Sequence, residues 1–125
     1  MRLLSSILLG VAALFGALAM LPQGASAERS DVSHGRYLVM NAGKCTDCHG
    51  AKLQGMHLGF MAPHMPIEYD APKIAGLPQL SQAAAARFLQ TGRLPNGSMA
   101  RPPMPQFRFN RSDAMAIAAY LKSMR

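Results

Sequence analysis

The chain contains the sequence Cys45-Thr46-Asp47-Cys48-His49, a C-x-x-C-H motif. In this pattern, two thiols three positions apart each add to one vinyl group on the same edge of a porphyrin and form two thioether bonds. The histidine directly after the second thiol is then held beneath the iron, where its imidazole becomes the proximal ligand. The motif therefore predicts one covalently attached haem c, bound through Cys45 and Cys48 and ligated by His49.

Three other kinds of site compete for the same cysteine pair. A redox-active dithiol is expected within a βαβ pattern, and none is visible around the motif. A zinc site needs a second cysteine pair or two closely spaced histidines, but Cys45 and Cys48 are the only cysteines, and His57 and His64 are seven positions apart. A small structural disulfide is the third alternative. Haem attachment fits the full five-residue pattern best.

The first 27 residues have the pattern of a secretory signal peptide. A basic start at Arg2 precedes a nearly unbroken apolar run at 7–21, and the Ala-Ser-Ala sequence at 25–27 fits an A-x-A cleavage site. An uncleaved anchor helix is the alternative, but the apolar run is shorter than the about 20 residues that span a bilayer. We therefore expect a signal peptide at 1–27, a single domain at 28–125, export to the periplasm and no stable membrane insertion after cleavage.

The predicted mature domain is small and basic. Its 98 residues include 12 Lys and Arg against six Asp and Glu. A chain this short buries a modest core and commonly needs a metal, a disulfide or a cofactor for stability, and a central haem would meet that need. A basic excess of this size suits nucleic acid, anionic lipid or an acidic protein. For an exported haem protein we favour a redox partner with an acidic docking surface, and we expect no nucleic acid.

Hydrophobic periodicity predicts three main helices and no lasting strand pattern. The predicted N-caps are, in chain order, Ser30 or Asp31, Ser81 and Ser112. Gly43 and Gly92 follow the first two helices as stop signals, and the third helix runs to the C-terminus. The predicted fold class is therefore all-α, with long loops.

The two long loops, at 50–80 and 93–111, are rich in Gly, Pro and Met and lack clear periodicity. Structureless loops of this length are uncommon in a compact domain. A haem resolves this difficulty, because both loops can wrap around the porphyrin instead of packing on each other. The loops thus agree with the haem predicted from the motif.

The second loop contains Arg101-Pro102-Pro103-Met104-Pro105. Prolines fix the backbone φ angle, so they would present the Met104 sulfur from a stiff support. A thioether is a soft, neutral ligand, and a His/Met pair raises the reduction potential of haem iron. We therefore predict Met104 as the second axial ligand. The alternative is that Met104 is one more packing methionine, since the mature chain contains eight.

These features together resemble the monohaem class I cytochromes c of bacteria over residues 30–125. The likeness rests on a helix leading into C-x-x-C-H, a proline-flanked methionine and a closing helix that reads Ser-Asp-Ala-x-Ala-Ile-Ala-Ala-Tyr-Leu from Ser112. It implies the class I cytochrome c fold, with three main helices and long loops wrapped around one haem. It also implies export, because bacteria attach this haem outside the cytoplasm.

The resemblance also bears on individual residues. In that family the distal methionine lies about 16 residues before an aromatic residue of the last helix; Met104 precedes Tyr120 by 16 positions and Met99 precedes it by 21. The first and last helices would cross near Gly35, with Tyr120 or Leu121 packed over it. The likeness thus favours Met104 over Met99 as the distal ligand.

A finer likeness connects the chain with the small cytochrome c subunits of periplasmic dehydrogenases. Residues 71–74 read Ala-Pro-Lys-Ile, which is similar to their Ala-Pro-Asn-Ile, with Lys73 in place of the asparagine. The family also uses a proline carbonyl to orient the proximal histidine, and Pro63, Pro66 and Pro72 are all candidates. The resemblance does not choose among the three.

A second set of soft ligands lies at 56–65, with the order Met56, His57, Met61, His64 and Met65. These residue types suit copper. Their spacing is loose, however, and methionines packed against the haem edge explain them more simply.

Two classes of function remain. In an electron carrier the protein fills both axial positions and binds no substrate at the iron, whereas a haem enzyme or gas sensor needs an open or displaceable sixth position. The predicted pair of His49 and Met104 favours the carrier, either free or as the haem subunit of a dehydrogenase, and not itself an enzyme. Lys44, Arg93 and Arg101 would place positive charge near the haem edge, toward an acidic partner.

Overall fold

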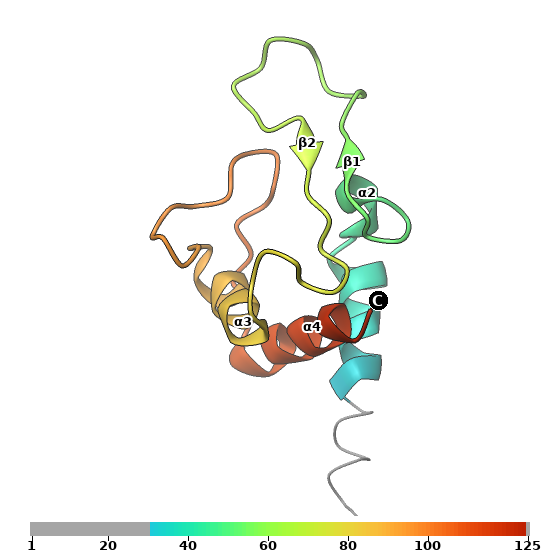
Figure 1. Cartoon of the computed structure of the whole chain (residues 1–125), viewed down its shortest axis with the longest axis vertical. Helices are drawn as coiled ribbons and strands as arrows, with labels where there is room; N and C mark the ends of the chain where they lie inside the picture. The colour runs from blue at the N-terminus through green and yellow to red at the C-terminus, as the bar shows by residue number, and fades with distance from the viewer. Residues whose placement is uncertain (1–30, 125) are drawn as a thin grey trace, which may run out of the picture.

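The computed structural model describes residues 31–124 of the chain and is mainly helical (Figure 1). Residues 31–37 are helical and continue directly into the π-helix η1 (Leu38–Ala42). The later elements are α2 (Thr46–His49), β1 (Met56–His57), β2 (Asp70–Ala71), α3 (Gln82–Thr91) and α4 (Arg111–Ser123). Long loops connect these elements, as the sequence predicts, and the all-α class is confirmed.

The predicted signal peptide at 1–27 and its cleavage site lie outside the described residues. Ser30, one of the two predicted caps of the first helix, lies outside them as well, whereas Asp31 is helical. Between residues 31 and 124, no helix has the length and apolar character needed to cross a membrane.

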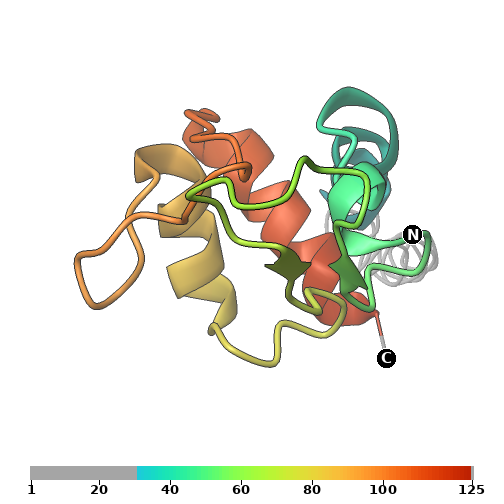
Figure 2. The same ribbon diagram turned by 90° about the horizontal axis from the view of Figure 1, so that it is seen from above.

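Helix α4 lies between the first helix and α3 (Figures 1 and 2). The first helix crosses α4 at Gly35, where a Cβ atom would collide with the Ala116 carbonyl and lie 2.9 Å from Cβ of Tyr120. The crossing therefore requires glycine at position 35, because any side chain would separate the two helices. The crossing expected from the family likeness, with Tyr120 packed over Gly35, is confirmed.

Helices α3 and α4 pack along each other and form most of the core. The buried cluster joins Ala85 and Leu89 of α3 to Ile117 and Leu121 of α4. It also includes Leu38 and Val39 of η1 and, from the loop at 50–80, Leu53, Ala75 and Leu77. Small alanines on both helices allow the close approach. The core is made mainly of aliphatic side chains, and Phe88, Phe107 and Phe109 are only partly buried at its border.

The caps of α3 agree with the sequence. The Ser81 hydroxyl accepts a hydrogen bond from the Ala84 backbone N–H at 3.2 Å, and this satisfies one of the free donors at the helix start. Gly92 ends the helix with a left-handed φ of 70°, a conformation that glycine adopts without a steric penalty.

The predicted cap of the last helix is wrong by two residues. Helix α4 begins at Arg111, and its N-cap is Asn110, whose side chain accepts from the Asp113 N–H at 2.9 Å. The Phe109 N–H donates to the Leu89 carbonyl at 3.1 Å. This bond fixes the chain at the end of α3, so the helix begins directly after it and Ser112 lies within the first turn.

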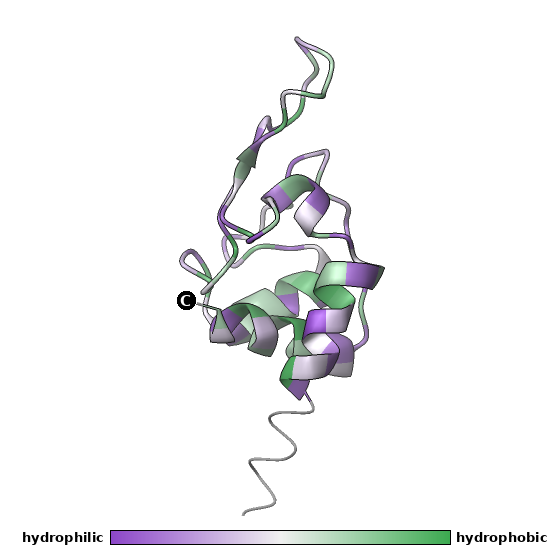
Figure 3. Ribbon diagram, turned by 90° about the vertical axis from the view of Figure 1, so that its right-hand side faces the viewer, coloured by the Kyte–Doolittle hydropathy of each residue, from purple (hydrophilic) through white to green (hydrophobic). Residues whose placement is uncertain are grey.

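The loop at 50–80 contains a short antiparallel pair that the sequence does not predict. Strand β1 pairs with β2 in the register Met56 with Ala71 and His57 with Asp70. Residues 58–69, which we call the finger, extend from this pair away from the helices, with green hydrophobic stretches near the end (Figures 1 and 3).

Candidate haem-binding site

The C-x-x-C-H motif forms a single turn of helix, with Cys45 as the N-cap of α2 and Cys48 and His49 inside it. The His49 N–H donates to the Cys45 carbonyl at 2.9 Å, and the Cys45 N–H donates to the Val39 carbonyl of η1 at 3.1 Å. Because residues three apart in a helix share one face, the two thiols lie on the same side of the turn. The preceding π-helix is a type of element that is frequent at functional sites.

Both cysteines are free and half-buried. Burial raises the pKa of the Cys45 thiol above its ordinary value, and the nearby Cys48 and Asp47 add to the rise, although a backbone hydrogen bond opposes it. The neutral thiol is therefore favoured, which suits a sulfur that ends as an uncharged thioether.

His49 is buried, with 6% of its surface exposed. Its Nδ1 lies 2.7 Å from the Pro72 carbonyl oxygen. Since a carbonyl only accepts, Nδ1 carries the proton, and Nε2 keeps the free lone pair that a metal ligand needs. Of the three candidate prolines, the structure selects Pro72; Pro63 and Pro66 lie in the exposed finger.

Backbone contacts hold Pro72 beside the histidine. The Ile74 and Ala75 N–H groups both donate to the Leu53 carbonyl at 3.0 Å, and the Gly55 N–H donates to the His49 carbonyl at 2.9 Å. Gly55 has a φ of 90°, and a Cβ atom there would come within 2.9 Å of the Ala71 carbonyl oxygen. The chain after the motif thus folds back on itself and fixes the orientation of the imidazole.

The two candidate distal methionines differ in their surroundings. Met104 is half-buried, and its N–H donates to the Arg101 carbonyl at 3.2 Å in a tight turn. Met99 is exposed, and its sulfur accepts a hydrogen bond from the Gln106 amide at 3.7 Å. The environment of Met104 therefore suits a ligand better than that of Met99.

The donor set fits a c-type haem better than the other sites weighed from the sequence. Cys45 and Cys48 are unbonded thiols on one helical face, and His49 beside them has one nitrogen engaged and the other free. Among residues 31–124, no three His, Cys, Asp or Glu side chains form a metal-binding group. The copper alternative gains no support, because His57 and His64 belong to no such group.

Two long-range contacts, one at the site and one between helices, are not evident in the sequence. The Glu68 N–H donates to the Pro102 carbonyl at 2.7 Å, which joins the base of the finger to the loop that carries Met104. His34 bonds Asp113 at 2.8 Å and ties the first helix to α4. Both connect residues more than 30 positions apart, and no local pattern indicates such contacts.

Comparison with known proteins identifies the family. The sequence model of the family described as cytochrome c matches residues 32–125, and the chain belongs to that family. No curated protein and no solved structure matches the chain. As a cytochrome c, the protein has the class I all-α fold and binds covalently attached haem c, whose iron supplies a one-electron redox couple. Cys45, Cys48 and His49 are the residues that would hold it.

Proposed function

We propose that this chain is an exported, periplasmic electron carrier whose haem is attached through Cys45 and Cys48 and ligated on both faces by the protein. His49 is the proximal ligand and Met104 the distal one. The hydrogen bond from His49 to the Pro72 carbonyl is the observation that carries the proposal. It holds the imidazole in one tautomer, with its second nitrogen free for iron.

The distal assignment decides between the two classes of function. With Met104 on the iron, no position is left for a substrate or a gas, and the iron can only exchange electrons. The half-buried Met104 on its hydrogen-bonded turn supports this arrangement. The experiment is to add carbon monoxide to the ferrous protein: an electron carrier should resist it, whereas an enzyme or sensor should bind it at once.

Export is the second part of the proposal. It rests on the signal-peptide pattern at 1–27 and on the need for haem attachment outside the cytoplasm. The intact mass of the purified protein should correspond to a chain that begins at Glu28 plus one haem. Acid–acetone extraction should leave the colour with the polypeptide; colour in the solvent, or a mass that includes residues 1–27, would contradict the proposal.

The third part concerns the partner, for which we propose an acidic docking surface. The chain has a formal net charge of +7, and Lys44, Arg93 and Arg101 are all exposed. Complementary charge steers two proteins together and mainly raises the association rate.

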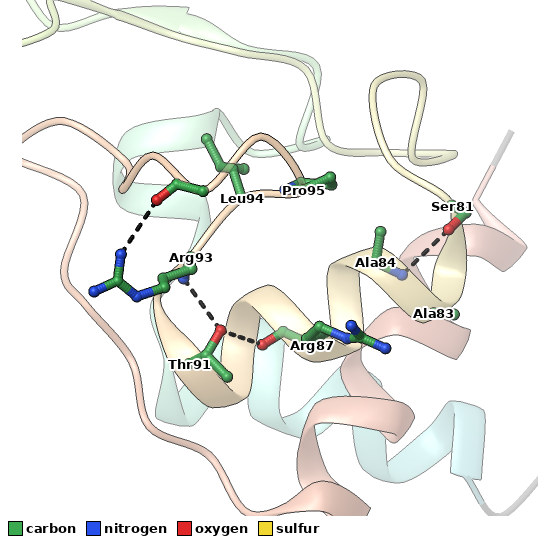
Figure 4. Close-up of a pocket in the computed structure, with 9 residues that line it drawn as sticks. Ser81, Ala83, Ala84, Arg87, Thr91, Arg93, Leu94 and Pro95 are labelled. Atoms are coloured by element: carbon green, nitrogen blue, oxygen red, sulfur yellow. Dashed lines mark hydrogen bonds between the residues drawn. The ribbon is translucent and has the colours of Figure 1, made fainter.

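A groove beside α3 adds to this basic surface (Figure 4). Its volume is about 530 Å³, and it is lined by Ser81, Ala83, Ala84, Arg87, Thr91, Arg93, Leu94, Pro95 and Gly97, with no acidic residue. Arg93 donates to the Gly97 carbonyl at 3.2 Å, and the guanidinium groups of Arg93 and Arg87 lie at opposite ends of the groove rather than converging (Figure 4). Separated charges of this kind suit an extended acidic surface better than one small anion.

A further inference from the structure

The finger is ordered from within, although it extends away from the helices (Figures 1 and 3). The Tyr69 hydroxyl lies inside the loop, where it donates to the Ala62 carbonyl at 2.7 Å and accepts from the Met65 N–H at 2.8 Å. The Leu58 N–H donates to the Tyr69 carbonyl at 2.7 Å, and Leu58 itself is buried at the base. These bonds fix the end of the finger in one conformation.

The ordered tip presents apolar side chains to solvent. Phe60 is 67% exposed and Met65 is 41% exposed. Aromatic side chains and methionines are enriched where proteins bind one another. Because the loop is already held in shape, little conformational entropy would be lost when a partner covers it.

The C-terminal stem of the finger, around β2, attaches next to both candidate iron ligands. Directly after β2, the Pro72 carbonyl accepts the hydrogen bond from His49 at 2.7 Å. Just before β2, the Glu68 N–H donates to the Pro102 carbonyl at 2.7 Å, two residues before Met104. A protein seated on the finger is therefore coupled through hydrogen bonds to both sides of the haem site.

The charges of the finger decide which occupant it suits. Residues 56–71 contain Glu68 and Asp70 but no Lys or Arg, so an anionic membrane would gain no electrostatic attraction there. A second copy of this chain is also disfavoured at long range, because each copy carries the same excess of positive charge. The exposed Lys73 and Arg101 stand at the base of the finger, where Arg101 pairs with Glu68 at 3.5 Å. This exposed ion pair is weak, so both cations can face an acidic rim that surrounds the finger, whereas a flat membrane that meets only the tip would not reach them.

We propose that the tip of the finger is the primary contact for the electron-transfer partner, a protein that offers an apolar recess surrounded by acidic residues. Phe60 and Met65 enter the recess, and Lys73 and Arg101 meet its rim. The inference rests on the proposed function as an electron carrier and adds the element of the chain that the partner recognises.

The test compares finger variants with matched controls elsewhere on the surface. Phe60→Ser and Met65→Ser remove the two exposed side chains of the tip. Tyr37→Ser in the first helix and Met115→Ser in α4 are the controls, because these residues are 59% and 49% exposed. Each holoprotein is reduced and mixed by stopped flow with an acidic blue-copper protein and, separately, with hexacyanoferrate, which needs no docking recess.

Each finger variant should lower the second-order rate with the copper protein by about tenfold, the loss typical of an aromatic contact at the centre of an interface. The hexacyanoferrate rate, the haem spectrum and the reduction potential should stay at wild-type values. Both controls should match the wild type in every measurement.

Several outcomes would overturn the inference. If the finger variants react with the copper protein at the same rate as the controls, the tip is not part of the interface. A changed spectrum or potential would show that Phe60 or Met65 packs on the haem instead. If the protein sediments with anionic phospholipid vesicles and Phe60→Ser abolishes this, the tip binds a membrane instead. If the protein dimerises and Phe60→Ser abolishes the dimer, the tip binds a second copy of the chain. If the proposed function itself fails, the ferrous wild-type protein will bind carbon monoxide whatever the rates of the finger variants, which separates that failure from failure of the docking site.

Discussion

The backbone N–H of Glu68 donates to the carbonyl of Pro102 at 2.7 Å. Four residues after Glu68, the Pro72 carbonyl accepts the hydrogen bond from His49, also at 2.7 Å. The short segment 68–72 therefore connects the histidine side of the haem site with the loop that presents Met104, and the separation of the two proposed axial ligands depends on it.

Glu68→Pro should loosen the distal ligand, because proline has no N–H to donate to Pro102. A hydrogen bond of this kind contributes about 1 kcal/mol, so the affinity of the ferric protein for imidazole should rise about fivefold as Met104 is displaced more easily. Glu68→Gln is the control: it keeps the N–H and breaks only the ion pair with Arg101, which spans 3.5 Å between largely exposed side chains and is weak. Equal imidazole affinity in all three proteins would mean that the segment does not hold the distal loop.

Gly35→Ala should destabilise the protein by about 3 kcal/mol, because the new methyl group collides with the Ala116 carbonyl, which is backbone and cannot move aside cheaply. Gly59→Ala is the matched control, since a Cβ atom there meets nothing closer than 3.6 Å. Chemical denaturation of the two holoproteins measures the difference. Similar unfolding midpoints would contradict the close helix crossing.

Asn110→Ala should cost about 1 kcal/mol of stability, the usual effect of losing an N-cap side chain, whereas Ser112→Ala should be nearly neutral. In the structure Asn110 accepts from the Asp113 N–H at 2.9 Å, and its own amide donates to the Asp113 carboxylate at 2.9 Å. The same unfolding measurement decides the matter. If Ser112→Ala lost more stability than Asn110→Ala, Ser112 would be the N-cap, as predicted from the sequence.

The N-cap of α4 shows what can be predicted from the sequence and what cannot. Asn110 and Ser112 are both good N-cap residues, and only the long-range bond between Phe109 and Leu89 chooses the earlier one. The C-x-x-C-H motif and the Pro-Met-Pro sequence are local patterns with a chemical meaning, so the haem and its candidate ligands could be predicted directly. The choice of Pro72 and the bond from Glu68 to Pro102 depend on how two long loops meet, which local patterns do not encode.

The proposed acidic partner makes the electron-transfer rate depend on salt. The rate with an acidic blue-copper protein should fall as salt rises from about 0.01 to 0.5 M, because the screening length shortens from about 30 Å to a few ångström. Arg93→Gln, in the groove beside α3, should lower the rate at low salt and flatten this dependence. Lys122→Gln, in the last turn of α4, is the control and should behave like the wild type. A rate that does not respond to salt would argue against a charge-steered carrier.

We propose that His49 and Met104 both ligate the iron, and the spectrum of Met104→Ala is the decisive measurement of this ligation. The wild-type ferric protein should be low-spin and show the weak far-red charge-transfer band of an iron–sulfur bond to methionine, and its ferrous form should resist carbon monoxide. Met104→Ala should lose the band, have a lower reduction potential because the soft ligand is gone, and bind carbon monoxide. Met99→Ala should keep all three wild-type properties. A wild-type protein that is high-spin and binds carbon monoxide readily would show that Met104 does not ligate the iron.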